Sequence, residues 1–349
     1  MNKKTIRRSL FLILSGFLLL SLWLFRARIV KRKEALASTP FSTVETVQEP
    51  ILPLPQTLPL DEKKVALGEK LFHDPILSKD NTISCSSCHN LKTGGVDLTE
   101  RSVGIQGKTG DINSPTVFNS GFNFKQFWDG RAETLEDQVD GPTHNPKEMG
   151  SDWNEITGKL SKSKEYVKEF DEIYQEGIIP KNIRDAIATF ERSLYTPNSR
   201  FDQYLRGAPS ALGEDEKKGY QIFKSYGCIS CHQGMNAGGN MFQTFGVMRD
   251  YFADRGKVTP ADYGRFNVTG DEFDRYTFKV PSLRLVALTP PYFHDGTAKT
   301  LEEAVTIMGR YQLGRELTKE EIRLIILFLK TLVGEYKGKP LLEKESEWE

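Results

Sequence analysis

The sequence predicts an all-α fold of two similar domains, preceded by an N-terminal membrane-anchor or signal segment. Three observations support this fold class. Apolar residues recur at helical spacing, a Cys-x-x-Cys-His pattern occurs twice, and a weak repeat relates the two halves at an offset of 166 positions. The chain has 349 residues, which is enough for two domains with separate cores.

The first 33 residues carry an uncharged stretch between two basic flanks. Four Lys and Arg residues precede the stretch from Ser9 to Phe25, and five follow it. Its length is just sufficient to cross a bilayer, so residues 1–33 are predicted to be an uncleaved anchor. A signal peptide cleaved near Ala37 is the alternative. Residues 34–59 are rich in Pro, Thr and Ser, which predicts a semi-rigid linker, and the folded body is expected to start near Leu60.

The formal net charge of zero hides an acidic body. Beyond residue 33 the chain carries 38 basic against 47 acidic side chains. Nucleic acid requires a basic surface, so it is excluded as a partner. A basic protein partner is electrostatically more plausible.

All four cysteines belong to the two repeated patterns, Cys85-Ser-Ser-Cys88-His89 and Cys228-Ile-Ser-Cys231-His232. Disulfides, a thioredoxin-like pair and a zinc site are the other uses of paired cysteines. The histidine directly after the second cysteine favours haem c instead, because two thioethers fix the porphyrin and the histidine then binds the iron. The sequence therefore predicts two cytochrome c-like domains related by duplication, each with one covalent haem, over residues 60–198 and 199–336, and a tail over 337–349.

The repeat has one informative difference. Met308 follows the second haem motif on a predicted helix, where it can supply the sixth iron ligand. The same offset places Pro142 in the first half. Proline cannot bind iron, and it is expected to end the helix. The first haem is therefore predicted to keep an open position for a small molecule, while the second haem relays electrons. Helices are expected at 62–72, 135–139, 183–194, 214–223, 301–308 and 319–332.

Polar residues surround the expected open site. A carboxylate such as Glu148 can move a proton between the two oxygens of a peroxide, and an amide such as Gln138 can orient it. Both can equally be solvated residues of a loop and a helix. Trp128 can carry an electron between the haems or serve as ordinary packing. His144 can ligate the first haem at rest or be a solvated histidine of a loop.

From about Leu60 to Tyr336 the sequence resembles the bacterial di-haem cytochrome c peroxidases. The motifs are the first CxxCH sequence and residues 113–119, 127–131, 135–142, 145–149 and 290–296. The resemblance implies that His89 ligates a low-potential peroxidatic haem with Gln138 and Glu148 as its catalytic pair. It also implies that Trp128 lies between the haems. His232 and Met308 would then ligate a high-potential electron-transfer haem.

The resemblance implies further partners. Ca²⁺ would bind at the positions of Asn113, Thr289 and Pro291, and the protein would be a homodimer. Together with the segment at 1–33, this predicts a periplasmic protein anchored to the inner membrane. Hydrogen peroxide would be the substrate, and a small cytochrome c or cupredoxin the electron donor. One position departs from the family. Many members rest with a distal histidine on the peroxidatic iron, and Ile105 stands there in this chain, so the first site is expected to be open even when oxidised.

Two alternatives stay open. The first is an enzyme similar to the methylamine-utilisation di-haem proteins, which oxidises residues of a partner protein. That family carries a tyrosine on the second iron; Met308 speaks against it, although Tyr311 is close in sequence. The second is a non-enzymatic electron carrier, which would need both irons to be ligated on both faces.

Overall fold

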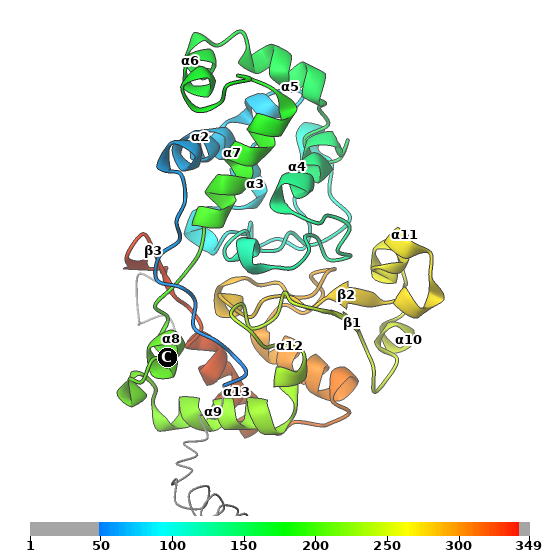
Figure 1. Cartoon of the computed structure of the whole chain (residues 1–349). Helices are drawn as coiled ribbons and strands as arrows, with labels where there is room; N and C mark the ends of the chain where they lie inside the picture. The colour runs from blue at the N-terminus through cyan, green and yellow to red at the C-terminus, as the bar shows by residue number, and fades with distance from the viewer. Residues whose placement is uncertain (1–48, 342–349) are drawn as a thin grey trace, which may run out of the picture. The chain divides into compact units, whose positions relative to one another are not determined.

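The computed structural model describes residues 49–341, and helices dominate this part of the chain (Figure 1). The prediction of a helical fold is thereby confirmed, although two antiparallel strand pairs, β1–β2 and β3–β4, accompany the helices. The helices are α2 (Glu62–His73), α3 (Cys85–Cys88), α4 (Leu135–His144), α5 (Trp153–Leu160), α6 (Lys164–Ile173), α7 (Pro180–Ser193), α8 (Arg200–Leu205), α9 (Glu214–Ser225), α10 (Tyr251–Arg255), α11 (Phe266–Thr269), α12 (Leu301–Ile307) and α13 (Lys319–Lys330). The strands are β1 (Phe242–Thr244), β2 (Thr277–Lys279), β3 (Glu335–Tyr336) and β4 (Lys339–Pro340).

Each half of the described chain is built on a pair of packed helices, α2 with α7 and α9 with α13 (Figure 1). A glycine lies at each contact. A Cβ atom at Gly68 would come 2.0 Å from the carbonyl oxygen of Ala186. A Cβ atom at Gly219 would come equally close, 2.0 Å, to the carbonyl oxygen of Leu324. Gly68 and Gly219 therefore have the same role in the two helix pairs, since only a residue without a side chain permits this approach of the backbones.

The same local geometry recurs in both halves at the offset of 166 residues. Short backbone bridges join Gln126 to Ala132 in the first half and Tyr292 to Ala298 in the second. Left-handed backbone conformations also recur at this offset, at Asn119 and Leu285 and at Phe127 and Phe293. Non-glycine residues adopt this conformation rarely, so the recurrence reflects a shared architecture of the two halves.

The two halves are joined by a pair of crossed backbone hydrogen bonds. The Asn113 N–H donates to the carbonyl oxygen of His294 at 2.7 Å, and the Lys279 N–H donates to that of Trp128 at 2.8 Å. The two donor residues, Asn113 and Lys279, are 166 positions apart, and so are the two acceptor residues, Trp128 and His294. Each half therefore contributes one donor and one acceptor from equivalent positions.

Helix α4 corrects the prediction that Pro142 ends its helix. The helix was expected to stop at Val139, but it continues to His144 with the proline inside it. Proline removes only its own donor. The Thr143 hydroxyl adds a side-chain bond to the helix, since it donates to the carbonyl oxygen of Val139 at 2.6 Å. The Asn145 N–H donates to the carbonyl oxygen of Gly141 at 3.0 Å.

Part of the predicted linker at 34–59 belongs to the folded body, which begins earlier than expected. The side chains of Ile51 and Leu54 are fully buried. The carbonyl oxygen of Leu52 accepts a hydrogen bond from the buried Arg284 side chain at 3.0 Å. The apolar residues between the prolines pack into the core of the second half, so the prolines here shape a packed segment rather than a free tether.

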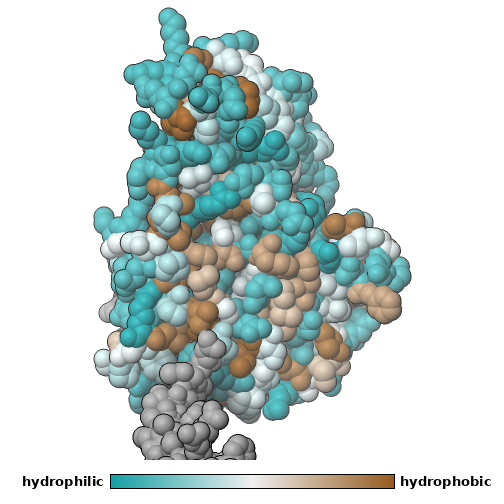
Figure 2. All heavy atoms as spheres, in the orientation of Figure 1, coloured by the Kyte–Doolittle hydropathy of each residue, from teal (hydrophilic) through white to brown (hydrophobic). Residues whose placement is uncertain are grey.

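The chain end returns to the first half: Tyr336 packs edge-on against Phe118, Leu341 packs against the apolar cluster that contains Phe118, and Lys337 pairs with Glu69 at 3.0 Å. The predicted anchor over residues 1–33 and the last eight residues lie outside the described residues. Between residues 49 and 341, none of the helices has the length and apolar character needed to cross a membrane. Figure 2 shows mainly hydrophilic residues on the visible face, with apolar ones in scattered groups.

Candidate functional site

The second CxxCH motif forms a short turn beside a buried histidine. Gly227 has a left-handed conformation (φ 89°), and residues Cys228–Ser230 form one turn of 3₁₀-helix. The His232 Nδ1–H donates to the carbonyl oxygen of Ala237 at 3.3 Å. Burial lowers the pKa of His232 to about 4. The imidazole is therefore neutral, and its Nε2 lone pair is available, which is the form that binds a haem iron.

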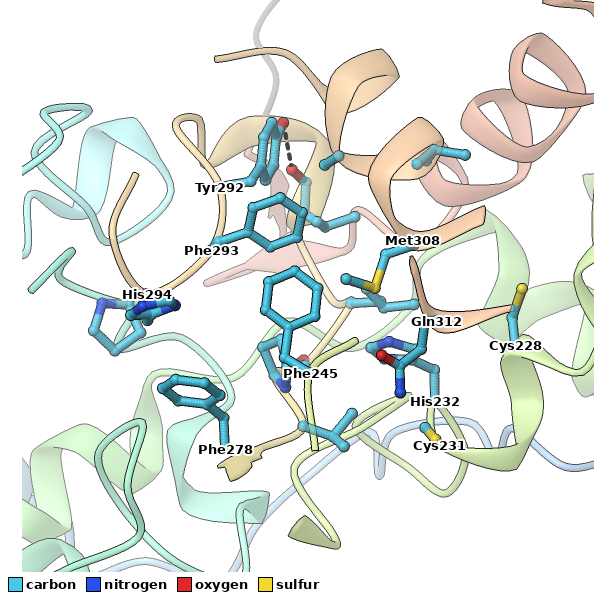
Figure 3. A pocket seen from close by; sticks show the side chains of 18 of the residues that line it. Cys228, Cys231, His232, Phe245, Phe278, Tyr292, Phe293, His294, Met308 and Gln312 are labelled. Atoms are coloured by element: carbon cyan, nitrogen blue, oxygen red, sulfur yellow. Dashed lines mark hydrogen bonds between the residues drawn. The ribbon is translucent and has the colours of Figure 1, made fainter. Parts of the chain in front are cut away.

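A cavity of about 270 Å³ adjoins this motif. Cys228, Cys231, His232 and Met308 all line it, together with aromatic side chains such as Phe245 (Figure 3). Met308 follows α12 directly and starts a single turn of π-helix. An apolar cavity with two thiols, an imidazole and a thioether on its wall fits a covalently attached haem with two axial ligands.

Tyr311 takes no part in this cavity. Its ring packs edge-on against Tyr251, with 5.1 Å between the ring centroids. The residues that line the cavity include Met308 and Gln312 but not Tyr311. The thioether is thus the side chain placed to face the second motif.

The first CxxCH motif forms helix α3, and its histidine is held in the same way. The His89 Nδ1–H donates to the carbonyl oxygen of Gly95 at 3.2 Å. Burial lowers the pKa of His89 and raises that of the Cys85 thiol to about 12. All four cysteines of the chain are free in the structure. A raised thiol pKa argues against a thioredoxin-like pair, which needs a readily formed thiolate, and thioether attachment of haem does not.

Glu148 lies close to the first motif on a closely packed pair of loops. The Ile105 N–H donates to the carbonyl oxygen of Glu148 at 2.8 Å, and Ile105 is almost completely buried. A Cβ atom at Gly104 would come 2.1 Å from the carbonyl oxygen of Lys147, so this glycine allows the loops to meet. Burial is the main cause of the raised pKa of Cys88, and the negative charge of Glu148 adds a small contribution to it.

The Glu148 carboxyl is itself suited to proton transfer. Burial raises its pKa, while a hydrogen bond from Asn145 Nδ2 to Oε1 at 2.6 Å opposes that shift. Gln138 is half-buried on α4, and within residues 49–341 it makes no hydrogen bond to Glu148. His144 is exposed, and its ring lies edge-on to Trp153 with 5.8 Å between centroids.

Trp128 lies where the two halves meet. Its indole Nε1–H donates to the carbonyl oxygen of Asn113 at 3.0 Å, and its ring lies edge-on to His294 with 6.3 Å between centroids. Trp128 also lines the cavity of the second motif, as do Asn113, Thr289 and Pro291, the positions implied for Ca²⁺. The side-chain Nδ2 of Asn113 donates to the carbonyl oxygen of Thr99 at 2.9 Å.

Sequence reasoning missed a buried charged network beside Trp128. His294 Nε2 and Asp262 Oδ1 lie 2.7 Å apart. Arg255 binds both oxygens of Asp262, at 2.9 and 2.8 Å, and also pairs with Asp295. The single positive charge of the Arg255 guanidinium is thus shared between the two carboxylates, which stabilises them in this buried position. Its members are far apart in the sequence, and no short motif reveals them.

The fold and these sites define a helical protein with two CxxCH haem-binding motifs in unlike surroundings. A thioether faces the motif of the second half. The motif of the first half is accompanied instead by the half-buried carboxyl of Glu148 and by the buried Ile105.

Comparison with known proteins identifies the family. The family model described as di-haem cytochrome c peroxidase matches residues 62–210. The chain is 50% identical to a cytochrome c peroxidase of Escherichia coli over 89% of its own length and 66% of that protein's. It is 47% identical to a cytochrome c551 peroxidase of Nitrosomonas europaea over 84% of its own length and 86% of that protein's. The chain therefore belongs to the di-haem cytochrome c peroxidase family, whose members are oxidoreductases.

A solved structure supports the same assignment. The crystal structure of a MauG-like protein associated with microbial copper homeostasis matches 82% of this chain and 94% of that one, with a TM-score of 0.71 and 31% identity. The helical arrangement of the described residues is thus that of a di-haem peroxidase.

Proposed function

We propose that the protein reduces hydrogen peroxide to two waters at the first CxxCH site, using two protons and two electrons that arrive by way of the second site. Haem c bound at each motif would supply an iron that accepts and donates single electrons. The observation that carries the proposal is the unequal surroundings of the two motifs. Met308 faces the second motif, whereas the equivalent position in the first half is Pro142. We attribute the unequal halves to duplication followed by divergence.

Glu148 would be the proton carrier of the reaction. Burial raises the pKa of Glu148, which favours its use as a proton carrier, and Asn145 holds the carboxyl in one orientation. Gln138 would orient the peroxide through its amide, and Trp128 would conduct electrons between the two halves. Met308, rather than Tyr311, faces the second motif, which favours peroxide reduction over oxidation of a partner protein. A pure electron carrier would need a second ligand at the first motif.

The wider setting follows from the resemblance. We infer a periplasmic protein that takes electrons from a small cytochrome c or cupredoxin, with the 1–33 segment as an inner-membrane anchor. Ca²⁺ would bind where Asn113, Thr289 and Pro291 line the cavity, and the active form would be a homodimer. Chelation of Ca²⁺ and measurement of the oligomeric mass test the last two inferences.

The activity is tested by mixing the half-reduced protein with peroxide and following oxidation of an added reduced cytochrome c. Sustained donor oxidation is the expected result. A stable oxidised state without donor turnover would instead favour the enzyme that acts on a partner protein, and the absence of any reaction would favour a carrier.

Ile105 provides a sharper test of the open first site. We expect the fully oxidised protein to have one high-spin haem and to react with peroxide without prior reduction. Ile105→His should supply a ligand, convert this haem to low spin and make activity depend on prior one-electron reduction. Ile105→Val is the matched control and should behave as the unmodified protein does. A fully oxidised protein with two low-spin haems would contradict the reasoning.

A further inference from the structure

Lys279, the last residue of β2, is a buried cation without a counter-ion. Its side chain is only 6% exposed. Within residues 49–341, its ammonium makes no hydrogen bond or ion pair. Burial lowers the pKa of Lys279 to about 8, and no neighbouring carboxylate raises it. Such a group is rare in native proteins, since a buried charge is normally paired.

The residues around the Lys279 ammonium indicate where its counter-ion comes from. This is the cavity that holds Cys228, Cys231, His232 and Met308, and none of its lining residues is Asp or Glu. The anion must therefore come with the occupant. A porphyrin carries two propionate carboxylates, and a carboxylate is the usual partner of a buried ammonium.

We propose that the Lys279 ammonium binds a propionate carboxylate of the haem in the second site and raises the reduction potential of that haem. The inference rests on the proposed function, in that haem occupies the second motif. A nearby positive charge disfavours the ferric state, which carries one more positive charge than the ferrous state. The ferrous form of the second haem would thus be favoured, so this haem would take an electron readily from an external donor.

The internal repeat shows that this cation is specific to one half. Asn113 occupies the position equivalent to Lys279, and the two residues make the crossed hydrogen bonds to the opposite halves. Two positions after each of these residues stands a proline, Pro115 or Pro281. The backbone of each proline is hydrogen-bonded to the CxxCH histidine of its own half. The neutral amide stands beside the first site and the ammonium beside the second. The difference in charge therefore matches the difference in role between the two haems.

The test uses the haem-loaded protein and three variants, Lys279→Met, Lys279→Arg and the exposed control Lys319→Met. Mass spectrometry counts the attached haems, and a spectroelectrochemical titration gives the potential of each. Lys279→Met should lower the potential of the second haem by about 59 mV, which is a tenfold change in the equilibrium constant of a one-electron couple. The first haem should keep its potential, and Lys279→Arg should restore most of the shift.

An unchanged second potential in Lys279→Met, or an equal shift in Lys319→Met, would overturn the proposal. If the Met variant does not fold, a crystal structure of the haem-loaded protein decides, with the Lys279 Nζ expected within ~4 Å of a propionate oxygen of the second haem. An ammonium that faces water or a protein carboxylate there would refute the inference. If the unmodified protein has no peroxide turnover but Lys279→Met still lowers the potential of the second haem, the proposed function alone is overturned. Absence of haem at Cys228 and Cys231 would overturn both the proposed function and this inference.

Discussion

Glu191 on α7 is a buried carboxyl. The equivalence of the helix pairs α2–α7 and α9–α13 indicates that it lies near the first haem motif. Gly68 packs against Ala186 and Phe190, as Gly219 packs against Leu324 and Phe328 in the second half. The residue after Phe328 is Leu329, which lines the cavity of the second motif. Its counterpart in the first half is Glu191, whose charge contributes to raising the pKa of Cys85.

The magnitude of the effect follows from the pKa. Burial raises the pKa of Glu191 from 4.5 to about 8, although the charge of Arg192 opposes the shift. The folded protein therefore holds a proton here that the unfolded chain releases above pH 4.5. Stability linked to this group is fully present below pH 4.5 and is lost as the pH rises towards 8. At pH 7 the cost is about 3 kcal/mol, at 1.36 kcal/mol per pKa unit.

The perturbation is Glu191→Gln, which keeps the shape and cannot ionise. Urea unfolding of the haem-loaded protein and the variant is measured at pH 4.5 and at pH 7, with the slope m checked for constancy. Relative to the unmodified protein, the variant should gain about 3 kcal/mol between the two pH values. The exposed Glu172→Gln is the control, and its difference from the unmodified protein should stay constant. A Glu191→Gln difference that is also independent of pH would refute the reasoning.

Two further predictions concern other buried charges. Glu148→Gln should reduce peroxide turnover by about 10²–10⁴-fold with the haem content unchanged, because the positioned proton carrier is lost; normal turnover in a stopped-flow assay would exclude this role. Arg284→Met should destabilise the protein by about 3–5 kcal/mol in urea unfolding, because the fully buried Asp202, 2.8 Å from the Arg284 guanidinium, loses its partner. Adding Asp202→Asn should recover part of that loss, and a double variant no more stable than the single one would count against the explanation.

Much of the architecture can be predicted from local patterns in the sequence. Helical spacing located the main helices, and the CxxCH sequences located both candidate sites without any knowledge of packing. The position of Met308 after the second CxxCH motif made it the candidate iron ligand, and Met308 lines the cavity of that motif. These features are local or periodic, which is why one sequence was enough.

The errors have equally specific causes. Pro142 was expected to end α4, but a proline near the last turn removes a single donor, and the chain's own caps satisfy the rest. Ile51 and Leu54 lie in a Pro-rich stretch, and composition could not show that the second half offers them a core. Glu191 and Lys279 are ordinary charged residues until helix pairing and strand pairing bury them. Their environment is a property of the tertiary structure.

The unpaired ammonium of Lys279 also has a consequence for biogenesis. A polypeptide that closed this cavity before receiving its porphyrin would enclose a positive charge in an apolar space, which is strongly unfavourable. The chain should thus stay loosely folded around the second motif until the thioether bonds have formed. Maturation of this half would then have a fixed order, with attachment first and compaction afterwards, so that only correctly loaded molecules escape proteolysis.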